Sequence, residues 1–399
     1  MSSILPLVLL AALAGAATLL LERGGRRGYG WVTGSEFALA GLALGPLGLD
    51  LVSQALLDRA ELPIALGASW VGLGLGLRLR KTSFQHVPAA HVIASQVEPL
   101  VALVVLRLLI EAAARLGGMT LPSEASWALA AAGAGTTRSM MDWARAQQGA
   151  RGPLTEALRT ICTFNDATPL LALALLFAAA PPHETLLATV WQRLGAMGFL
   201  SLGLAALVLV VVGRRRFRPQ IAWLALFGSA VLGTGLALEL GLLPVTCLFL
   251  CGVVVARTTR HADGLEEVTR STQRPVIQVL LLLAGASVRG GGLALAAALL
   301  FTLLRGCAKA ISGAAVSPLA APRFPTLGLG LLGGGGVLFA AAFSASQVLP
   351  GDVGGPLLAG AVAMVIVGDA FGPPALRSLL LHAGEMPESA AAAGPQPQP

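Results

Sequence analysis

The feature that most constrains this chain is a succession of long apolar stretches that few charged side chains interrupt. Only 12% of its 399 residues are charged, whereas about 25% are charged in an average soluble domain. So few charges could not cover the surface of a soluble fold of this size, and an apolar content of 55% excludes a disordered chain. The sequence therefore predicts an all-α polytopic membrane protein, in which each crossing needs about 20 apolar residues of helix.

Read with that length, the chain divides into 13 candidate transmembrane segments. They lie at about 4–21, 31–49, 61–78, 87–114, 124–146, 154–179, 186–213, 220–240, 242–257, 274–288, 291–317, 326–349 and 353–381. The transmembrane domain then covers residues 1–385, and the Ala- and Pro-rich residues 386–399 predict a disordered tail.

Basic residues are concentrated in alternate connections between these segments. Connections after odd-numbered segments carry Arg23, Arg26, Arg27, Arg80, Lys81, Arg151, Arg214, Arg215, Arg216, Arg218, Arg260, Arg270 and Arg323, and the other connections hold little beyond Arg59, Arg115 and Arg289. The positive-inside rule places the connections after odd-numbered segments in the cytoplasm, so the N-terminus is expected outside the cell and the C-terminus in the cytoplasm. The expected location is the cell's inner (plasma) membrane. These loops account for the formal charge of +7, so no nucleic-acid partner is expected.

A short sequence recurs with opposite expected orientation. Gly-Ala-Ser, followed by two glycines and a leucine, stands at 67–75, at the end of the third segment, and again at 285–293, at the end of the tenth. This recurrence indicates two inverted repeats of six helices, at about 4–179 and 220–381, with a linker helix at 186–213. Chance recurrence in a chain rich in Gly, Ala and Leu is the alternative explanation.

The fifth segment of each half carries glycines near its centre, which predicts two broken crossing helices. A glycine costs about 1 kcal/mol in a helix interior, and paired interruptions of this kind mark a transport site at the bilayer midplane. Small residues that allow close helix packing are the alternative for isolated glycines. The residues are Gly133 and Gly135 beside Thr136 and Thr137 in the first segment, and Gly333, Gly334, Gly335 and Gly336 in the second.

The sixth segment carries an acid well inside its apolar stretch. An ionised carboxylate costs about 2.5–3.5 kcal/mol at the centre of a membrane helix, so Asp166 needs a function or a partner. Its neighbour Asn165 is the only asparagine in the chain. Carboxylate, amide and hydroxyl oxygens are hard ligands suited to Na⁺ or K⁺, and a carboxylate also takes up a proton. Asp166, Asn165, Thr136 and Thr137 therefore form the candidate ion- and proton-binding site, with a purely structural Asp166 as the alternative.

Further ionisable residues inside the segments need partners. Arg305 and Lys309 lie one helical turn apart, and either is a candidate to balance the charge of Asp166. Arg107 and Glu111 are spaced to pair with each other. Four further residues are candidates for a supporting role around the site or for a proton path: Arg138, Glu98, Asp369 and Cys162. For the acids Glu98 and Asp369, an ion pair with Arg138 is a further alternative.

Together these residues resemble the monovalent cation:proton antiporter superfamily, which includes sodium/proton exchangers and potassium efflux antiporters. Asn165-Asp166 is similar to the family's Asn-Asp pair, and Thr136-Thr137 to its threonine signature in a broken helix. Either Arg305 or Lys309 would be the cation of its basic helix. Further similar stretches lie at 38–49, 283–287, 327–336 and 372–373.

The resemblance implies a homodimer of 13-span subunits, each with a dimerisation domain and a mobile core that carries the ion by an elevator-like movement. The Asn-Asp pair implies electroneutral exchange. Thr136-Thr137-Arg138 departs from the Thr-Asp-Pro that is frequent in such members of the family, and Asp369 stands where a small or hydroxyl residue is more usual.

The sequence thus predicts a secondary active antiporter that exchanges Na⁺ or K⁺ for protons. An anion or organic-solute transporter on a related scaffold, favoured by Arg138, and a transport-inactive membrane sensor are the alternatives. No enzyme activity, cofactor or structural metal is expected, because the sequence shows no nucleophile with a base and no metal-ligand spacing. Gly72, Gly74 and Gly76 belong to an apolar segment and not to a phosphate-binding turn.

Overall fold

The structure is a computed structural model that describes residues 33–53, 56–57, 59–80, 87–118, 121–181, 187–213, 218–289 and 292–386. Every regular element in these ranges is a helix, which confirms the all-α class. The first expected segment, at 4–21, and the tail at 386–399 beyond Met386 lie outside the described residues.

The helices follow one another with short connections. They are α2 (Ser35–Leu44), α4 (Glu61–Arg78), α5 (Ala89–Leu116), α6 (Ser123–Ala134), α7 (Ser139–Gln148), α8 (Pro153–Phe164), α9 (Ala167–Ala179), α10 (Val190–Gly213), α11 (Pro219–Glu239), α12 (Pro244–Thr258), α13 (Ala262–Ser287), α14 (Gly292–Ala320), the 3₁₀ helix η2 (Leu327–Leu331), α15 (Gly336–Val348) and α16 (Gly351–His382). Six stretches of the described chain are long and apolar enough to cross a membrane, and α2, α12 and α15 are shorter apolar helices.

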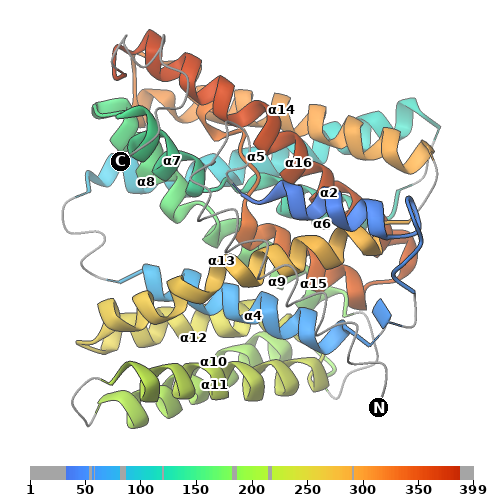
Figure 1. Cartoon of the computed structure of the whole chain (residues 1–399), viewed down its shortest axis with the longest axis vertical. Coiled ribbons are helices and arrows are strands. Elements are labelled where there is room, and N and C mark those ends of the chain that lie inside the picture. Colours follow the sequence, from blue (N-terminus) through green and yellow to red (C-terminus); the bar gives the residue numbers. More distant parts are fainter. Residues whose placement is uncertain are drawn as a thin grey trace.

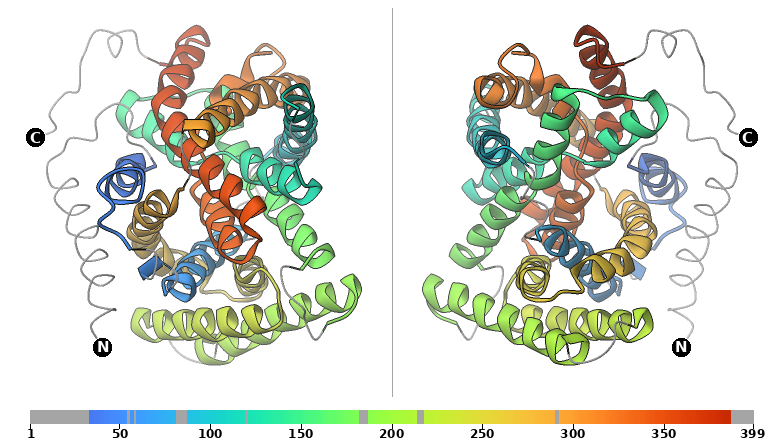
Figure 2. Two further views of the ribbon diagram at one scale, coloured as in Figure 1. Left: turned by 90° about the vertical axis from the view of Figure 1, so that its right-hand side faces the viewer. Right: turned by 90° about the vertical axis from the view of Figure 1, so that its left-hand side faces the viewer.

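The helices are arranged in layers (Figure 1). Helices α10 and α11 form the layer along one edge, and α4, α12 and α13 lie next to it. Helices α5, α14 and α16 lie on the far side, and the views turned by 90° show the same order (Figure 2). The shorter helices α6, α9 and α15 lie between these groups, at the centre of the molecule.

Glycines bring several helices into backbone contact. A Cβ at Gly76 of α4 would lie 2.1 Å from the carbonyl oxygen of Phe249, and one at Gly252 of α12 would lie 2.4 Å from a carbonyl oxygen of α4. The same holds for Gly41 of α2 and Gly285 of α13, which face each other's helices. No larger residue fits at such distances, so isolated glycines in these helices serve close packing.

Helix α13 is longer than the apolar segment expected at 274–288. It begins at Ala262 and passes through Pro275. Its first turns are polar, so a search for apolar residues misses them. Arg80, just after α4, forms ion pairs with Asp263 and with Glu266, which hold this polar end of α13 beside the end of α4.

Two stretches of non-helical chain meet at the centre of the molecule. The first begins at Gly135, which is extended, and the second ends at Gly335, which is also extended. The glycine runs and the interruptions differ slightly, because Gly133 still belongs to the last turn of α6 and Gly336 already starts α15. A Cβ at Gly335 would lie 3.6 Å from the amide nitrogen of Thr136, so the two interruptions are in contact.

Candidate functional site

The central acid lies at the junction of α8 and α9. Asn165 and Asp166 keep helical backbone angles, although the helix assignment stops at Phe164 and resumes at Ala167. Pro169 has no N–H, so it cannot donate to the carbonyl of Asn165 as a helical residue would. The pair therefore sits at a local gap in the backbone hydrogen bonds of one apolar span, Pro153–Ala179.

The side chain of Asp166 lies between the two interruptions. It is 6% exposed, and the backbone N–H of Thr136 donates a hydrogen bond to its carboxylate. A Cβ at Gly135 would lie 2.5 Å from Oδ1 of Asp166, and a Cβ at Gly335 would lie 3.2 Å from the same oxygen. Glycine in both interruptions thus leaves room for the carboxylate.

Several buried polar atoms at this junction lack a hydrogen-bond partner within the described residues. They are Oδ1 of Asp166 and both Oδ1 and Nδ2 of Asn165, whose side chain is fully buried. Native structures contain few such atoms, and an unsatisfied group in a native site calls for a specific explanation. Two adjacent residues with free oxygen atoms provide ligands suited to a small monovalent cation.

The two threonines have different partners. The hydroxyl of Thr136 donates to the carbonyl oxygen of Leu331, 3.0 Å away in η2. The hydroxyl oxygen of Thr137 accepts the backbone N–H of Ser139 at 3.3 Å, at the start of α7. Thr136 thus contributes its amide to Asp166 and its hydroxyl to the end of η2, while Thr137 accepts a hydrogen bond at the start of α7.

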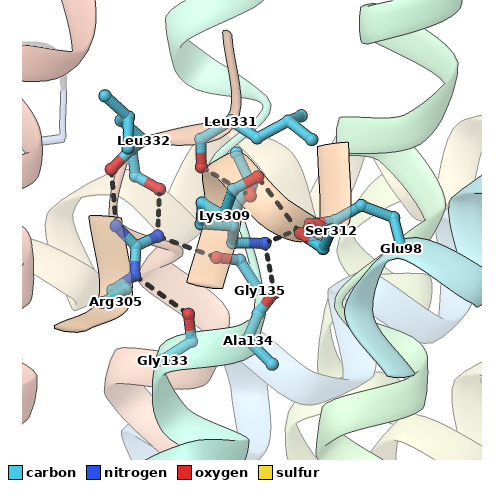
Figure 3. A network of polar contacts seen from close by, with 11 residues as sticks. Glu98, Gly133, Ala134, Gly135, Arg305, Lys309, Ser312, Leu331 and Leu332 are labelled. Carbon is cyan, nitrogen blue, oxygen red and sulfur yellow. Dashed lines mark hydrogen bonds and ion pairs between the residues drawn. The ribbon is translucent and has the colours of Figure 1, made fainter. Parts of the chain in front are cut away.

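Arg305 of α14 connects the two interruptions through their carbonyl groups (Figure 3). Its guanidinium donates to the carbonyl oxygens of Gly133 and Gly135, each at 2.9 Å. It also donates to Leu332 at 2.6 Å and Gly333 at 2.9 Å. A helix that stops leaves its last carbonyls without partners and with a partial negative charge, and the planar fork of arginine matches several of them at once.

Lys309, one turn further along α14, lies in the same network (Figure 3). Its ammonium group forms an ion pair with Glu98 of α5 at 2.9 Å, and both side chains are fully buried. It also donates to the carbonyl of Ala134, the last residue of α6. The hydroxyl of Ser312 donates to the same oxygen of Glu98 at 2.8 Å. Arg305 and Lys309 thus share a helix face, as their spacing indicates, and both bind the end of α6.

The remaining ionisable candidates, Arg138 and Asp369, have partners other than Asp166. Arg138 is paired with Asp142 at 3.4 Å, and the carboxylate of Asp369 accepts the backbone N–H groups of Thr33 and Ser35 before and at the start of α2. A pair between Arg138 and either Glu98 or Asp369 is therefore not found among the described residues. That alternative is wrong because each of the three has a nearer partner.

Two further expectations concern residues on α5 and α8. Arg107 and Glu111 form the expected pair at 2.8 Å, and the guanidinium of Arg107 also lies over the ring of Trp127. Cys162 is buried one turn before Asp166.

Sequence reasoning missed two polar side chains near the site. Gln96 of α5 contacts the α8–α9 junction. Arg78, at the end of α4, donates to Gln273 at 2.6 Å and interacts electrostatically with Asp166. A glutamine two residues before the buried Glu98, in an apolar segment, was the available signal for Gln96. Arg78 lies at the end of its segment, where basic residues are ordinary.

The described residues contain no cluster of three or more His, Cys, Asp or Glu side chains that could hold a metal ion. The chemistry of the junction is thus that of one carboxylate with amide, hydroxyl and backbone groups around it. Such a site can exchange a proton for a monovalent cation at the same oxygen atoms.

No family model and no curated protein matches the sequence of this chain. Solved structures match its fold. The sodium proton antiporter MjNhaP1 from Methanocaldococcus jannaschii at pH 8 matches with a TM-score of 0.72 and 15% identity, over 95% of this chain and 99% of its own. The chain has the fold of a sodium/proton antiporter. An electron-microscopy structure of MjNhaP1 agrees, with a TM-score of 0.68 and 15% identity over 97% and 99% of the two chains.

The match to the antiporter fold covers nearly the whole chain, so the resemblance to the monovalent cation:proton antiporters is confirmed at the level of the fold. Together with the long apolar helices, it makes the chain a multi-pass membrane protein. The two matched structures are transporters and not enzymes.

Proposed function

We propose that the protein is a secondary active antiporter in which Asp166 alternately binds a proton and a monovalent cation, Na⁺ or K⁺. The observation that carries this proposal is the position of a buried carboxylate with a free oxygen between two helix interruptions. The antiporter fold supports it. Ion and proton compete for the same oxygen atoms, so one cannot be carried while the other is bound.

The proposed ligands come from the junction and from the first interruption. Asp166 and Asn165 supply carboxylate and amide oxygens that have no partner within the described residues. The hydroxyls of Thr136 and Thr137 retain lone pairs in addition to their present hydrogen bonds. Lys309 interacts electrostatically with Asp166, so it balances part of the charge of Asp166 in the absence of a cation even though its ion pair is with Glu98.

The proposed architecture combines the repeats and the orientation predicted from the sequence with the homodimer and the mobile core that the resemblance implies. Two inverted repeats, at about 4–179 and 220–381, would be joined by a linker helix at 186–213, in a total of 13 spans. The stretches between α6 and α7 and between η2 and α15 would be the two broken crossing helices. The mobile core would move like an elevator, in a homodimer in the plasma membrane with the N-terminus outside and the C-terminus in the cytoplasm. Exchange would be electroneutral.

Transport measured in proteoliposomes tests the role of Asp166. Loss of the carboxylate in Asp166→Asn, which keeps the size of the side chain, is expected to lower cation-driven proton flux about 100-fold, in line with the loss of a charged contact. The matched control is Asp263→Asn, because Asp263 is an acid in the first turn of α13 with a highly exposed side chain. Flux in Asp166→Asn equal to that of Asp263→Asn would contradict the proposal.

The pH dependence has a definite sign. Protons occupy the carboxylate as the pH falls, so the apparent KM for the cation rises at low pH. At high pH the proton is scarce as the counter-substrate, so the maximal rate falls. Flux measured with Na⁺, K⁺ and Li⁺ over a range of pH is expected to show an optimum for the transported ion, and a KM independent of pH would contradict competition at Asp166.

A second candidate function is transport of an anion or organic solute on the same scaffold. The cationic side chains around the interruptions favour it, since Lys309 and Arg78 both interact with Asp166 and Arg138 starts α7. Organic-anion uptake that is independent of Na⁺ and lost in Arg138→Ala would support this function over cation exchange.

A further inference from the structure

The side chain of Gln96 bridges both ends of the Asn165–Asp166 junction. Its amide nitrogen donates to the carbonyl oxygen of Phe164, the last residue of α8, at 3.1 Å. Its amide oxygen accepts the hydroxyl of Thr168, in the first turn of α9, at 2.7 Å. One side chain of α5 therefore contacts the chain immediately before Asn165 and shortly after Asp166.

The chemistry of this bridge requires an amide. The last carbonyls of a helix lack partners within it and need a donor, while the hydroxyl of Thr168 needs an acceptor. Among similar side chains, glutamine offers a donor and an acceptor on one neutral group, whereas glutamate offers only acceptors when ionised and leucine offers neither. The nitrogen of Gln96 also donates to the hydroxyl oxygen of Ser95 at 3.1 Å, which orients the amide.

Helix α5 lies in contact with both the helices that flank the acid and the helix that carries the cations. It packs against α8 and α9 and also against α14. Gln96 contacts the junction that carries Asp166, while Glu98 contacts Lys309 of α14. Residues two apart on a helix point about 200° from each other, so the two contacts leave α5 in nearly opposite directions.

We propose that Gln96 is a positioning residue, which sets the orientation of Asn165 and Asp166 for cation binding by holding the Phe164 carbonyl before them and the Thr168 side chain after them. This inference rests on the function proposed above. The side chain of Asn165 has no hydrogen-bond partner within the described residues, and Asp166 keeps one free oxygen beside the N–H that Thr136 donates to its carboxylate. The geometry of the junction therefore sets much of the direction of both side chains. Gln96 holds this junction from both ends, through the carbonyl of Phe164 and the hydroxyl of Thr168.

Transport kinetics and hydrogen exchange of the full-length protein test the proposal. In Gln96→Leu, which keeps the size but removes both hydrogen bonds, the KM for the transported cation is expected to rise about three- to tenfold, the equivalent of one or two net hydrogen bonds. The maximal rate should change less than twofold, because the carboxylate is still present, and the pH optimum should shift. The matched control is Gln147→Leu, since Gln147 is an exposed glutamine in the last turn of α7 and its loss should leave KM and pH optimum unchanged.

Thr168→Val tests the bridge from its other end and serves if Gln96→Leu does not fold. It is expected to raise KM in the same direction, and the double variant should be no worse than Gln96→Leu alone, because both changes break one bridge. Additive effects of the two changes would overturn the bridge. An unchanged KM and pH optimum in both single variants would overturn the proposal.

Amide hydrogen exchange of peptides covering 161–170, in detergent and without any transport assay, separates this proposal from the proposed function. Faster exchange in Gln96→Leu than in Gln147→Leu supports the positioning role even if the wild-type protein carries no cation. Equal exchange in the two variants and the wild type overturns it even if cation transport is established.

Discussion

The interruption between α6 and α7 and the one between η2 and α15 both contact Asp166, yet different residues build them. The first combines Gly135 with two threonines, and the backbone N–H of Thr136 reaches the carboxylate. The second consists of glycines after Leu332, and its backbone is pressed against α16, since a Cβ at Gly368 would lie 2.6 Å from the amide nitrogen of Gly334.

The two interruptions therefore have different roles, one in the chemistry of the site and one in helix packing. The first interruption presents a backbone N–H donor to the carboxylate of Asp166, whereas the second brings its backbone close to a neighbouring helix. The charges are divided between the halves in the same way: Asp166 and Glu98 come from the half before α10, and Arg305 and Lys309 come from α14 in the other half. Arg305 then joins the two interruptions by binding the carbonyls of Gly133, in the last turn of α6, and of Gly135 on one side and those of Leu332 and Gly333 on the other.

The largest effect is expected from breaking the link between the interruptions. Arg305→Met leaves four carbonyl groups without their donor, and we expect the free energy of unfolding to fall by at least about 3 kcal/mol. Arg305→Lys should recover only part of this loss, because one ammonium group cannot reach carbonyls of both interruptions. Denaturant titration in detergent micelles measures the change.

Arg107→Met is the control for Arg305. Arg107 also lies in an apolar span, but its pair with Glu111 is partly exposed, so its loss should cost less than about 1 kcal/mol. Equal losses of stability in the two variants would mean that Arg305 does not hold the interruptions together.

Replacing one glycine by alanine in each interruption compares the two interruptions directly. In Gly135→Ala the new methyl group would lie 2.1 Å from Cδ1 of Leu338 and 2.5 Å from Oδ1 of Asp166. In Gly335→Ala it would lie 3.2 Å from the same oxygen, which a small shift relieves. Overpacking typically costs about 1–3 kcal/mol, so we expect flux to fall about tenfold or more in Gly135→Ala and less than about threefold in Gly335→Ala.

Flux in proteoliposomes at matched protein amounts is the measurement for this pair. The opposite order of the two variants would show that the second interruption carries the chemistry, and equal effects would remove the distinction between the interruptions.

The sequence predicts the positions of the central residues but not which residues they contact. Helix-breaking glycines beside Thr136 and the buried Asp166 are local signals, so the positions of the interruptions and of the acid could be predicted. The partners of Arg305 and Lys309 could not, because both lie on one helix face and only the packing of α14 on α5 and α6 decides which meets carbonyls and which meets Glu98.

Two further features, the start of α13 and the role of Gln96, could not be predicted from the sequence for physical reasons. Hydropathy finds the apolar part of α13 but not its polar first turns, which are held by the buried Leu265 and by the ion pairs of Arg80. Gln96 was missed because a polar side chain near the start of a span is ordinary in sequence. Its importance arises from its contacts with Phe164 and Thr168, which lie 68 and 72 positions further along the chain.

The smallest expected effect distinguishes the two threonines within the first interruption. Thr136→Val keeps the shape of the side chain but removes the hydrogen bond to Leu331 of η2, so it should cost about 1 kcal/mol of stability. Thr137→Val removes only an acceptor for the N–H of Ser139 at the start of α7 and should cost about 0.5 kcal/mol. Serine at either position should restore the wild-type value, because it keeps the hydroxyl group.

Transport measurements provide a second test of the difference between Thr136 and Thr137. Thr136 is fully buried and its amide binds Asp166, so a change in its contact with η2 moves the donor of the carboxylate, whereas Thr137 acts on α7 alone. Thr136→Val is therefore expected to raise the KM for the cation about threefold, on the scale of a single net hydrogen bond, and Thr137→Val to leave it within the error of measurement. If Thr137→Val raised the KM as much, both hydroxyls would act at the ion, and the first interruption would contribute ligands from two successive residues instead of one donor and one tie to η2.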